Sequence, residues 1–348
     1  MHRFDYSFLE GGLLPAAVAN FIADIYTLRA GARGRQEQYP EVFTALEAVA
    51  RVQSVKSSNA IEGIVTTDER LQAILNGSSA PLNHNELEIA GYRDALAQIH
   101  QQHDSLDISQ ADLLRLHALM LHPAGYATAG KYKSADNYIL EVDPTGRRRV
   151  RFSPTSAAAT PDAMEQLILA YREARDNPHL NQLLLIPCVI LDFLCIHPFQ
   201  DGNGRMSRLL SLLLLYKNGF DAGKYISFEE QINLRKGNYY AALEQSSSGW
   251  HENQQDYAPF MLEFLTTLYL CYRELDKRFA VVGSRKVSKH SRIEGTILNS
   301  PTPLSKSDIG QILPDVSATT IEAVLGQLVR AGKIRKIGAG RATRYLRT

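Results

Sequence analysis

Apolar residues recur at helical spacing along most of the chain, and two dense apolar runs near its middle carry the strongest pattern. The runs cover Val189–Ile196 and Leu209–Tyr216. Each suits a buried helix, and Pro198 follows the first run at a position where it stops a helix. A Gly-Asn-Gly sequence at 202–204 then makes a tight turn. The pattern predicts a helix, a short loop and a second helix.

Similar periodic patterns predict most of the other elements, and we expect a mainly α fold with one β-hairpin. An apolar stretch at Leu13–Leu28 gives way to a Gly/Arg/Gln-rich break that ends at Pro40. Strand-like runs within 137–152 flank a turn at Asp143–Gly146, which predicts the hairpin. Predicted helices cover residues 41–62, 68–75, 85–103, 110–121, 162–176, 181–196 and 257–279.

The last part of the chain is basic and has its own pattern. From Ser284 onward it holds twelve Lys and Arg against four Asp and Glu, whereas the whole chain is close to neutral. Three helices and a basic hairpin resemble a winged helix. The charge suits contact with a DNA backbone, but winged helices also bind proteins or dimerise, so both uses stay open. The elements are predicted at 293–298, 309–313, 318–331, 333–337 and 341–346.

The cysteine spacing and the apolar content argue against a disulfide scaffold and against a membrane protein. Cys188, Cys195 and Cys271 have no metal-ligand spacing, so we expect reduced core thiols rather than a disulfide scaffold. His117 and His122 are five apart, on different faces of a predicted helix, which argues against a metal site there. The first residues show no signal peptide, and no apolar run approaches a membrane span. We therefore expect a cytoplasmic protein.

The loop between the two dense runs carries side chains suited to chemistry on phosphate groups. His197 has an ordinary pKa near neutrality and can accept a proton from an attacking hydroxyl. Asp201 can hold a divalent cation such as Mg²⁺. The glycines of the turn permit positive φ angles and a nest of N–H groups for an anion. Arg205 and Arg208, in the first turn of the second helix, can both bind phosphate oxygens. Singly these are ordinary turn residues, but together they indicate phosphoryl or nucleotidyl transfer.

The full sequence His-Pro-Phe-x-Asp-Gly-Asn-Gly-Arg-x-x-Arg at 197–208 resembles the Fic family signature at every fixed position. The resemblance implies that His197 is the general base, that Asp201 binds Mg²⁺ and that Phe199 anchors the loop in the core. Related Doc kinases carry Lys at the second glycine of the turn, so glycine there favours AMP transfer over phosphorylation. The residues implied to bind ATP include Gly202, Asn203, Gly204, Arg205, Met206, Ser207 and Arg208.

A second short motif, Ser58-x-x-x-Glu62-Gly63, ends a predicted helix. Taken alone, it is a helix end with an exposed glutamate, and Gly63 suits the residue after such an end. The motif also resembles the inhibitory sequence (S/T)-x-x-x-E-(G/N) of Fic proteins, placed before the core as in their second class. The resemblance implies that Glu62 pairs with Arg208, which would otherwise hold the γ-phosphate of ATP.

Two further sets of residues follow from the resemblance. In Fic proteins a hairpin at this place is a flap that docks the protein target by strand addition, which implicates Asn137, Tyr138 and Ile139. Residues at this distance past the signature line the adenine pocket, which implicates Tyr239, Tyr240, Leu243 and, as a polar contact, Ser247. The basic run Arg147, Arg148, Arg149 and Arg151 either favours acidic targets or is only a solvated strand edge.

The resemblance implies a protein adenylyltransferase that transfers AMP from Mg²⁺·ATP to a Ser, Thr or Tyr hydroxyl of a protein, or of itself, under restraint by Glu62. We predict an N-terminal helical segment with the inhibitory motif at 1–105, a Fic core at 106–282 and a winged-helix domain at 283–348. Two other functions stay open. The chain could remove AMP from modified proteins, with Glu62 orienting a water, or it could regulate transcription while its core senses nucleotide.

Overall fold

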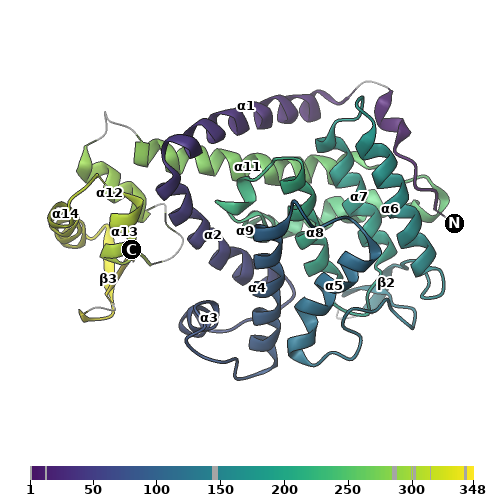
Figure 1. Ribbon diagram of the computed structural model, residues 1–348, viewed down its shortest axis with the longest axis horizontal. Coiled ribbons are helices and arrows are strands. Elements are labelled where there is room, and N and C mark those ends of the chain that lie inside the picture. Colours follow the sequence, from purple (N-terminus) through teal and green to yellow (C-terminus); the bar gives the residue numbers. More distant parts are fainter. Residues whose placement is uncertain are drawn as a thin grey trace. The chain divides into compact units, whose positions relative to one another are not determined.

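The computed structural model describes residues 2–11, 14–142, 148–283, 288–298, 300, 303–313, 315–340 and 343–348. The chain divides into two compact units. The first comprises Met1–Ala23, Val52–Asp221 and Phe228–Leu268, and the second comprises Asp24–Arg51, Ala222–Ser227 and Tyr269–Thr348. Helices make up most of the described chain, as predicted (Figure 1). The predicted division at residues 105 and 282 stays a prediction.

The helices follow the order of the predicted pattern. In the first half of the chain they are α1 Ala16–Gln38, α2 Pro40–Ile61, α3 Asp68–Leu75, α4 His84–Gln102, α5 Gln110–Leu121, α6 Thr160–Asp176 and α7 Gln182–Ile196. The second half contains α8 Asn203–Lys217, α9 Phe228–Leu234, α10 Lys236–Ser247, α11 Ala258–Gly283, α12 Lys289–Leu298, α13 Lys306–Ile312 and α14 Ala318–Arg330. Two antiparallel strand pairs accompany them, β1 Ile139–Val142 with β2 Arg148–Phe152 and β3 Ile334–Ile337 with β4 Arg344–Arg347.

Several helices begin directly after a polar residue whose side chain accepts an N–H group that has no partner within the helix. Thr67 begins α3, Ser109 begins α5, and Ser305 and Ser317 begin α13 and α14 in this way. The break predicted between residue 28 and Pro40 is wrong, since α1 continues through it. Glycine lowers helix propensity but does not forbid a helix, and neighbouring residues outweighed it here.

Helices α7 and α8 form the buried centre of the first unit. Every residue of α7 from Leu183 to Ile196 is buried, and α7 packs against α6, α8 and α10. Pro187 lies inside this helix. The three cysteines are free and buried, which confirms the prediction of core thiols. No helix in the described residues is both long and apolar enough to cross a membrane.

A buried carboxyl group ties the N-terminal segment to α7. Asp192 accepts hydrogen bonds from the Trp250 indole at 2.8 Å and from the hydroxyls of Tyr6 at 2.7 Å and Tyr257 at 3.0 Å. Burial raises the pKa of Asp192 to about 7, although these three donors oppose that rise. These hydrogen bonds hold α7 in place, and with it the loop that follows its C-terminal end.

The predicted hairpin is present as β1 and β2, with an irregular register. Leu140 pairs with Val150, but Ile139 pairs with Phe152, so Arg151 is an extra residue on β2. The turn predicted at 143–146 and Arg147 lie outside the described residues. Asn137 and Tyr138, expected on the first strand, precede β1.

Replacement of Gly91 by Ala should destabilise the first unit, because a Cβ on this residue of α4 would lie 1.9 Å from the backbone oxygen of Met120 in α5. Overpacking of this kind costs about 1–3 kcal/mol. The matched control is Gly31→Ala in α1, where a Cβ meets nothing within 4 Å, and which should stabilise by about 0.5–1 kcal/mol. Thermal unfolding of the two variants measures both effects, and equal melting temperatures would contradict the packing of α4 on α5.

Candidate active site

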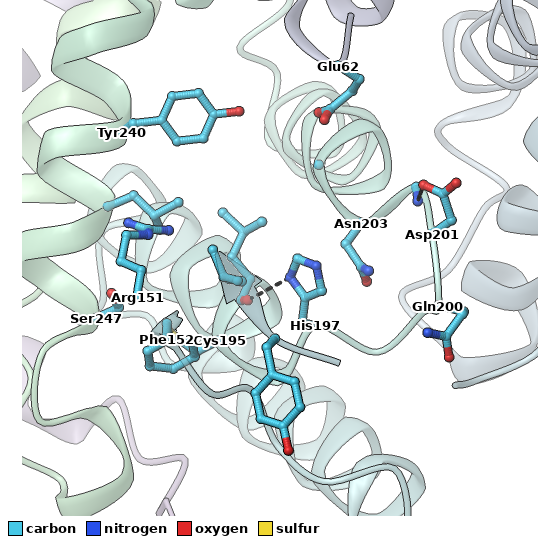
Figure 2. Close-up of a pocket in the computed structure, with 16 residues that line it drawn as sticks. Glu62, Arg151, Phe152, Cys195, His197, Gln200, Asp201, Asn203, Tyr240 and Ser247 are labelled. Carbon is cyan, nitrogen blue, oxygen red and sulfur yellow. Dashed lines mark hydrogen bonds between the residues drawn. The ribbon is translucent and has the colours of Figure 1, made fainter. Parts of the chain in front are cut away.

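His197 stands at the end of α7, where the chain turns sharply. Its φ angle is 51°, in the left-handed region that few residues with a Cβ adopt. Ring Nδ1 lies 3.3 Å from the carbonyl oxygen of Leu194 (Figure 2). A carbonyl only accepts, so Nδ1 carries the proton and Nε2 keeps its lone pair. The imidazole lines a cavity of about 300 Å³, so a free base is available to a bound hydroxyl.

Two asparagines hold the carbonyl and N–H groups of Phe199 in the loop that follows. The Asn203 side chain accepts the Phe199 N–H at 2.9 Å and donates to the Phe199 carbonyl at 2.7 Å. Asn137 donates to the same carbonyl at 3.0 Å. The side chain of Asn137 therefore faces the catalytic loop, which limits its predicted part in target docking to the backbone.

Lys133 fixes the two residues on either side of His197. Its Nζ donates to the Ile196 carbonyl at 3.1 Å, and its backbone N–H donates to the Pro198 carbonyl at 2.9 Å. The lysine is buried without a carboxylate in ion-pair distance among the described residues, and this burial lowers its pKa to about 8. Because carbonyls on both sides of His197 are bonded, the imidazole is positioned before any substrate binds.

His117 of α5 contacts the same loop through its ring and one of its ring nitrogens. Its ring stacks on the ring of Phe199 with centroids 3.7 Å apart. Its Nδ1 accepts the Gly130 N–H at 2.9 Å, so Nε2 carries the proton and donates to the Asp201 carbonyl at 3.0 Å. Burial lowers the pKa of His117 to about 4, which keeps this tautomer neutral. His117 is thus a buried support of the loop.

The electrostatic surroundings of His197 favour its neutral form. Its pKa is lowered to about 4, mainly by burial. The nearby cations Lys133 and Arg151 contribute to this lowering, whereas the hydrogen bond to the Leu194 carbonyl and the charge of Glu62 oppose it. At neutral pH the imidazole is therefore unprotonated and able to accept a proton.

The two sequence motifs meet in an ion pair. Arg208 Nη2 lies 2.8 Å from Glu62 Oε1, and the same guanidinium donates to Ser58 Oγ at 2.8 Å and to the Ser58 carbonyl at 3.0 Å. The Arg208 side chain is 2% exposed and that of Glu62 33%. Burial alone would lower the pKa of Arg208, but Glu62, together with the nearby Tyr92 and Tyr239, outweighs burial and raises that pKa. Gly63 follows α2 with a φ of +79°, as predicted for a residue after a helix end.

The second glycine of the turn gives Glu62 the room to reach Arg208. Gly202 has a φ of +80°, but Gly204 lies in the helical turn of α8, so the expectation of positive φ at both glycines is wrong for Gly204. A Cβ on Gly204 would lie 2.3 Å from Glu62 Oε1. Glycine is needed here for close approach and not for backbone freedom. Arg208 lies in the second turn of α8 and not in the first, because the helix begins at Asn203.

Arg205 is held by a carboxylate that carried no signal in the sequence. Its Nη1 lies 2.6 Å from Oε2 of Glu88 in α4, and both side chains are at most 5% exposed. Its Nη2 is 3.8 Å from Asp201 Oδ1. Arg205 Nε and Nη1 are both buried with no hydrogen-bond partner among the described residues, although Nη1 lies within ion-pair distance of Glu88, so Nε remains a donor for a ligand oxygen.

The remaining predicted residues divide into those that line the cavity and those that do not. Tyr239 is buried next to Tyr240, their rings 5.8 Å apart, and is not part of the lining. The predicted residues outside the lining also include Ser58, Gly63, Asn137, Arg205, Met206, Ser207 and Arg208. The predicted residues in the lining are Glu62, Tyr138, Ile139, His197, Asp201, Gly202, Asn203, Gly204, Tyr240, Leu243 and Ser247 (Figure 2).

Sequence reasoning placed Arg151 in a basic run on the flap and missed its place in the cavity. The extra residue on β2 turns its side chain into the lining together with that of Phe152. Among the described lining residues Arg151 is the only Lys or Arg. A register irregularity of this kind has no local sequence signal, so the position of Arg151 could not be predicted.

The model of the Fic/DOC family matches residues 107–215, which include the loop and both of its helices. Residues 107–215 form a Fic/DOC domain. The Fic domain so matched begins just before α5 and ends within α8. The predicted resemblance is thereby confirmed.

Two curated relatives share modest sequence identity with this chain. Protein adenylyltransferase Fic of Nematostella vectensis is 27% identical over 212 residues, which cover 58% of this chain and 44% of the relative. Protein adenylyltransferase fic-1 of Caenorhabditis elegans is 28% identical over 173 residues, which cover 46% and 31%. The chain thus spans less than half the length of these two relatives.

Solved structures show the same Fic fold. A Fic family protein from Desulfovibrio desulfuricans superimposes with a TM-score of 0.64 at 22% identity, covering 97% of each chain. Fic-1 (residues 134–508) from C. elegans gives 0.57 at 20% identity, covering 74% of this chain and 71% of that one.

We expect His197 to titrate near pH 4 in the folded Fic protein, as measured by NMR of ¹³C-labelled histidine and assigned by comparison with His197→Ala. Arg151→Gln and Lys133→Met each remove a cation, so each should raise that pKa, whereas Glu62→Gln should lower it. Arg149→Gln is the matched control, because this exposed arginine lies outside the lining. A pKa that is the same in all four variants would contradict the described electrostatics.

Proposed function

We propose that this Fic protein transfers AMP from ATP to a Ser, Thr or Tyr hydroxyl of a protein, and that Glu62 restrains the transfer. The observation that carries the proposal is the Glu62–Arg208 ion pair beside a catalytic histidine whose Nε2 is free. Curated relatives named protein adenylyltransferase add support.

The acceptor hydroxyl loses its proton to His197. As the hydroxyl oxygen bonds to the α-phosphorus of ATP, its proton passes to Nε2, and the bond from that phosphorus to the bridging oxygen breaks to release pyrophosphate. The fixed loop holds the imidazole in one orientation, so little reorganisation accompanies the proton transfer. The hydrogen bond from Nδ1–H to Leu194 stabilises the imidazolium that forms.

The negative charge of the phosphates is met by groups around the turn. Backbone N–H groups at the start of α8 and the unpartnered Nε of Arg205 point to phosphate oxygens as ligands. Glu88 keeps the Arg205 guanidinium in place for this contact. In the restrained state Glu62 takes the position on Arg208 that we assign to the γ-phosphate.

The residues present fit Mg²⁺ bound mainly through phosphates. The Asp201 side chain is 49% exposed at the cavity, and no group of three or more His, Cys, Asp or Glu residues in the described chain could hold a metal without help. Mg²⁺ commonly uses one or two carboxylates together with water and substrate phosphates, and would neutralise charge on them. Asp201 is the residue that would hold it.

The flap offers an edge for the protein target. Tyr138, Leu140 and Val150 are each more than half exposed, and Leu140 lies directly opposite Val150 in the sheet. An extended target segment that pairs with this hairpin would cover these apolar side chains and bring one hydroxyl towards His197.

Removal of Glu62 should raise activity. If the ion pair contributes about 1.5–3 kcal/mol, Glu62→Gly should increase AMP transfer on the order of ten- to a hundredfold. The measurement is self-labelling with α-³²P-ATP and Mg²⁺ on the wild type, Glu62→Gly and Glu62→Gly/His197→Ala.

Weak label on the wild type, strong label on Glu62→Gly and none on the double variant are expected. Equal label on the first two would contradict restraint by Glu62. Absence of label from all three, together with release of AMP from a modified protein by the wild type but not by Glu62→Gly, would favour the reverse reaction.

A further inference from the structure

The tail of the second unit has a helical scaffold with a projecting β-hairpin. Helix α12 is followed by Leu304, which exchanges two backbone hydrogen bonds of 2.8 Å with Tyr345, and then by α13 and α14. The hairpin of β3 and β4 comes last, and α14 packs against α12, α13 and β3. Apolar residues of all three helices are buried, so residues 288–348 have a small core of their own.

Each of the four carboxylates in this tail is already paired with its own base. The shortest nitrogen–oxygen distances are 2.5 Å for Lys333–Glu294, 2.6 Å for Arg292–Asp315, 3.1 Å for Lys306–Glu322 and 3.3 Å for Arg344–Asp308. The excess positive charge of the tail therefore resides on other residues.

The bases that remain are exposed and concentrate around the hairpin. No carboxylate among the described residues lies within ion-pair distance of them, and the described ones are Lys289, Arg330, Arg335, Lys336 and Arg347. Arg335 and Lys336 lie on opposite faces of β3, and Arg347 lies opposite Ile334 on β4. A hairpin with bases on both faces can contact phosphates on either side of it.

The exposed face of helix α14 has no unpaired acidic side chain and few large side chains. Its exposed side chains are small or neutral apart from Arg330 and from Glu322, which Lys306 pairs. Such a face can enter the major groove of B-DNA, which is about 12 Å wide. The exposed residues of α14 are Ala318, Thr319, Glu322, Ala323, Gly326, Gln327, Val329 and Arg330.

Aromatic content favours a duplex over a single strand. Proteins that hold single-stranded nucleic acid stack bases on exposed aromatic side chains. Tyr345 is the only Phe, Tyr or Trp after residue 283, and its side chain is 9% exposed. The tail therefore has positive charge that can contact a DNA backbone, but no exposed aromatic side chain on which unpaired bases could stack.

We propose that residues 288–348 bind double-stranded DNA, with the β3–β4 hairpin on the phosphate backbone and α14 facing the major groove. Binding is driven by Arg330, Arg335, Lys336 and Arg347, and it has little sequence preference because few side chains on α14 can read bases. This inference is independent of the proposed AMP transfer.

The test is fluorescence anisotropy of a labelled 24-base-pair duplex with the full chain, at sodium chloride concentrations from 50 to 200 mM. Four phosphate contacts predict a slope of log K against log salt of about −3.6. Arg335→Gln/Lys336→Gln should weaken binding and reduce the magnitude of the slope by about 1.8. Both side chains are exposed, so the melting temperature should not change.

The charge-matched control is Lys306→Gln/Lys333→Gln, which removes two bases that are already paired. This variant should keep the wild-type slope. Equal losses in the two double variants would mean attraction by net charge alone and would overturn the proposal. Three other results would overturn the proposal. The chain could bind single-stranded DNA or double-stranded RNA as tightly as the DNA duplex, or polyglutamate of equal charge could displace the DNA. The third result is absence of binding to the duplex at 50 mM salt.

Discussion

A buried guanidinium needs partners, and the candidate active site of this protein is organised around that requirement. Arg208 lies in α8 with its side chain 2% exposed, and both Ser58 and Glu62 of the segment at the end of α2 bind it. Leaving such a charge buried and unpaired costs several kcal/mol. The guanidinium of Arg208 therefore pairs either with Glu62 or with another anion that takes the place of the Glu62 carboxylate. Exchange of Glu62 for such an anion is the physical basis of the proposed restraint.

The close fit of Glu62 depends on a residue with no side chain. A Cβ at Gly204 would lie 2.3 Å from Oε1 of Glu62, so glycine at this position gives the carboxylate the space to reach Arg208. Around this point the catalytic loop is already rigid, because Lys133, His117 and Asn203 bond its carbonyl groups. Release of Glu62 thus needs no rebuilding of the loop, and a movement of one side chain suffices to change the charge that Arg208 presents.

The sequence predicted those parts of the site whose roles reside in contiguous motifs. The loop from His197 to Arg208 and the segment from Ser58 to Gly63 could be found because their residue types have fixed spacing. Glu88 and Lys133 could not be found, since each acts through a single tertiary contact with a residue far along the chain. Local propensity also gave a false break after residue 28, where α1 continues to Gln38.

The central claim is that Glu62 occupies the position of the γ-phosphate on Arg208. Calorimetry of ATP and ADP binding with Mg²⁺ tests it, with His197→Ala as background to prevent turnover. We expect ATP and ADP to bind this variant with equal affinity, because Glu62 blocks the contact that distinguishes them. In Glu62→Gly/His197→Ala, ATP should bind about ten- to a hundredfold more tightly than ADP, as a contact worth about 1.5–3 kcal/mol becomes available. The same ATP-to-ADP affinity ratio in both variants would contradict the claim.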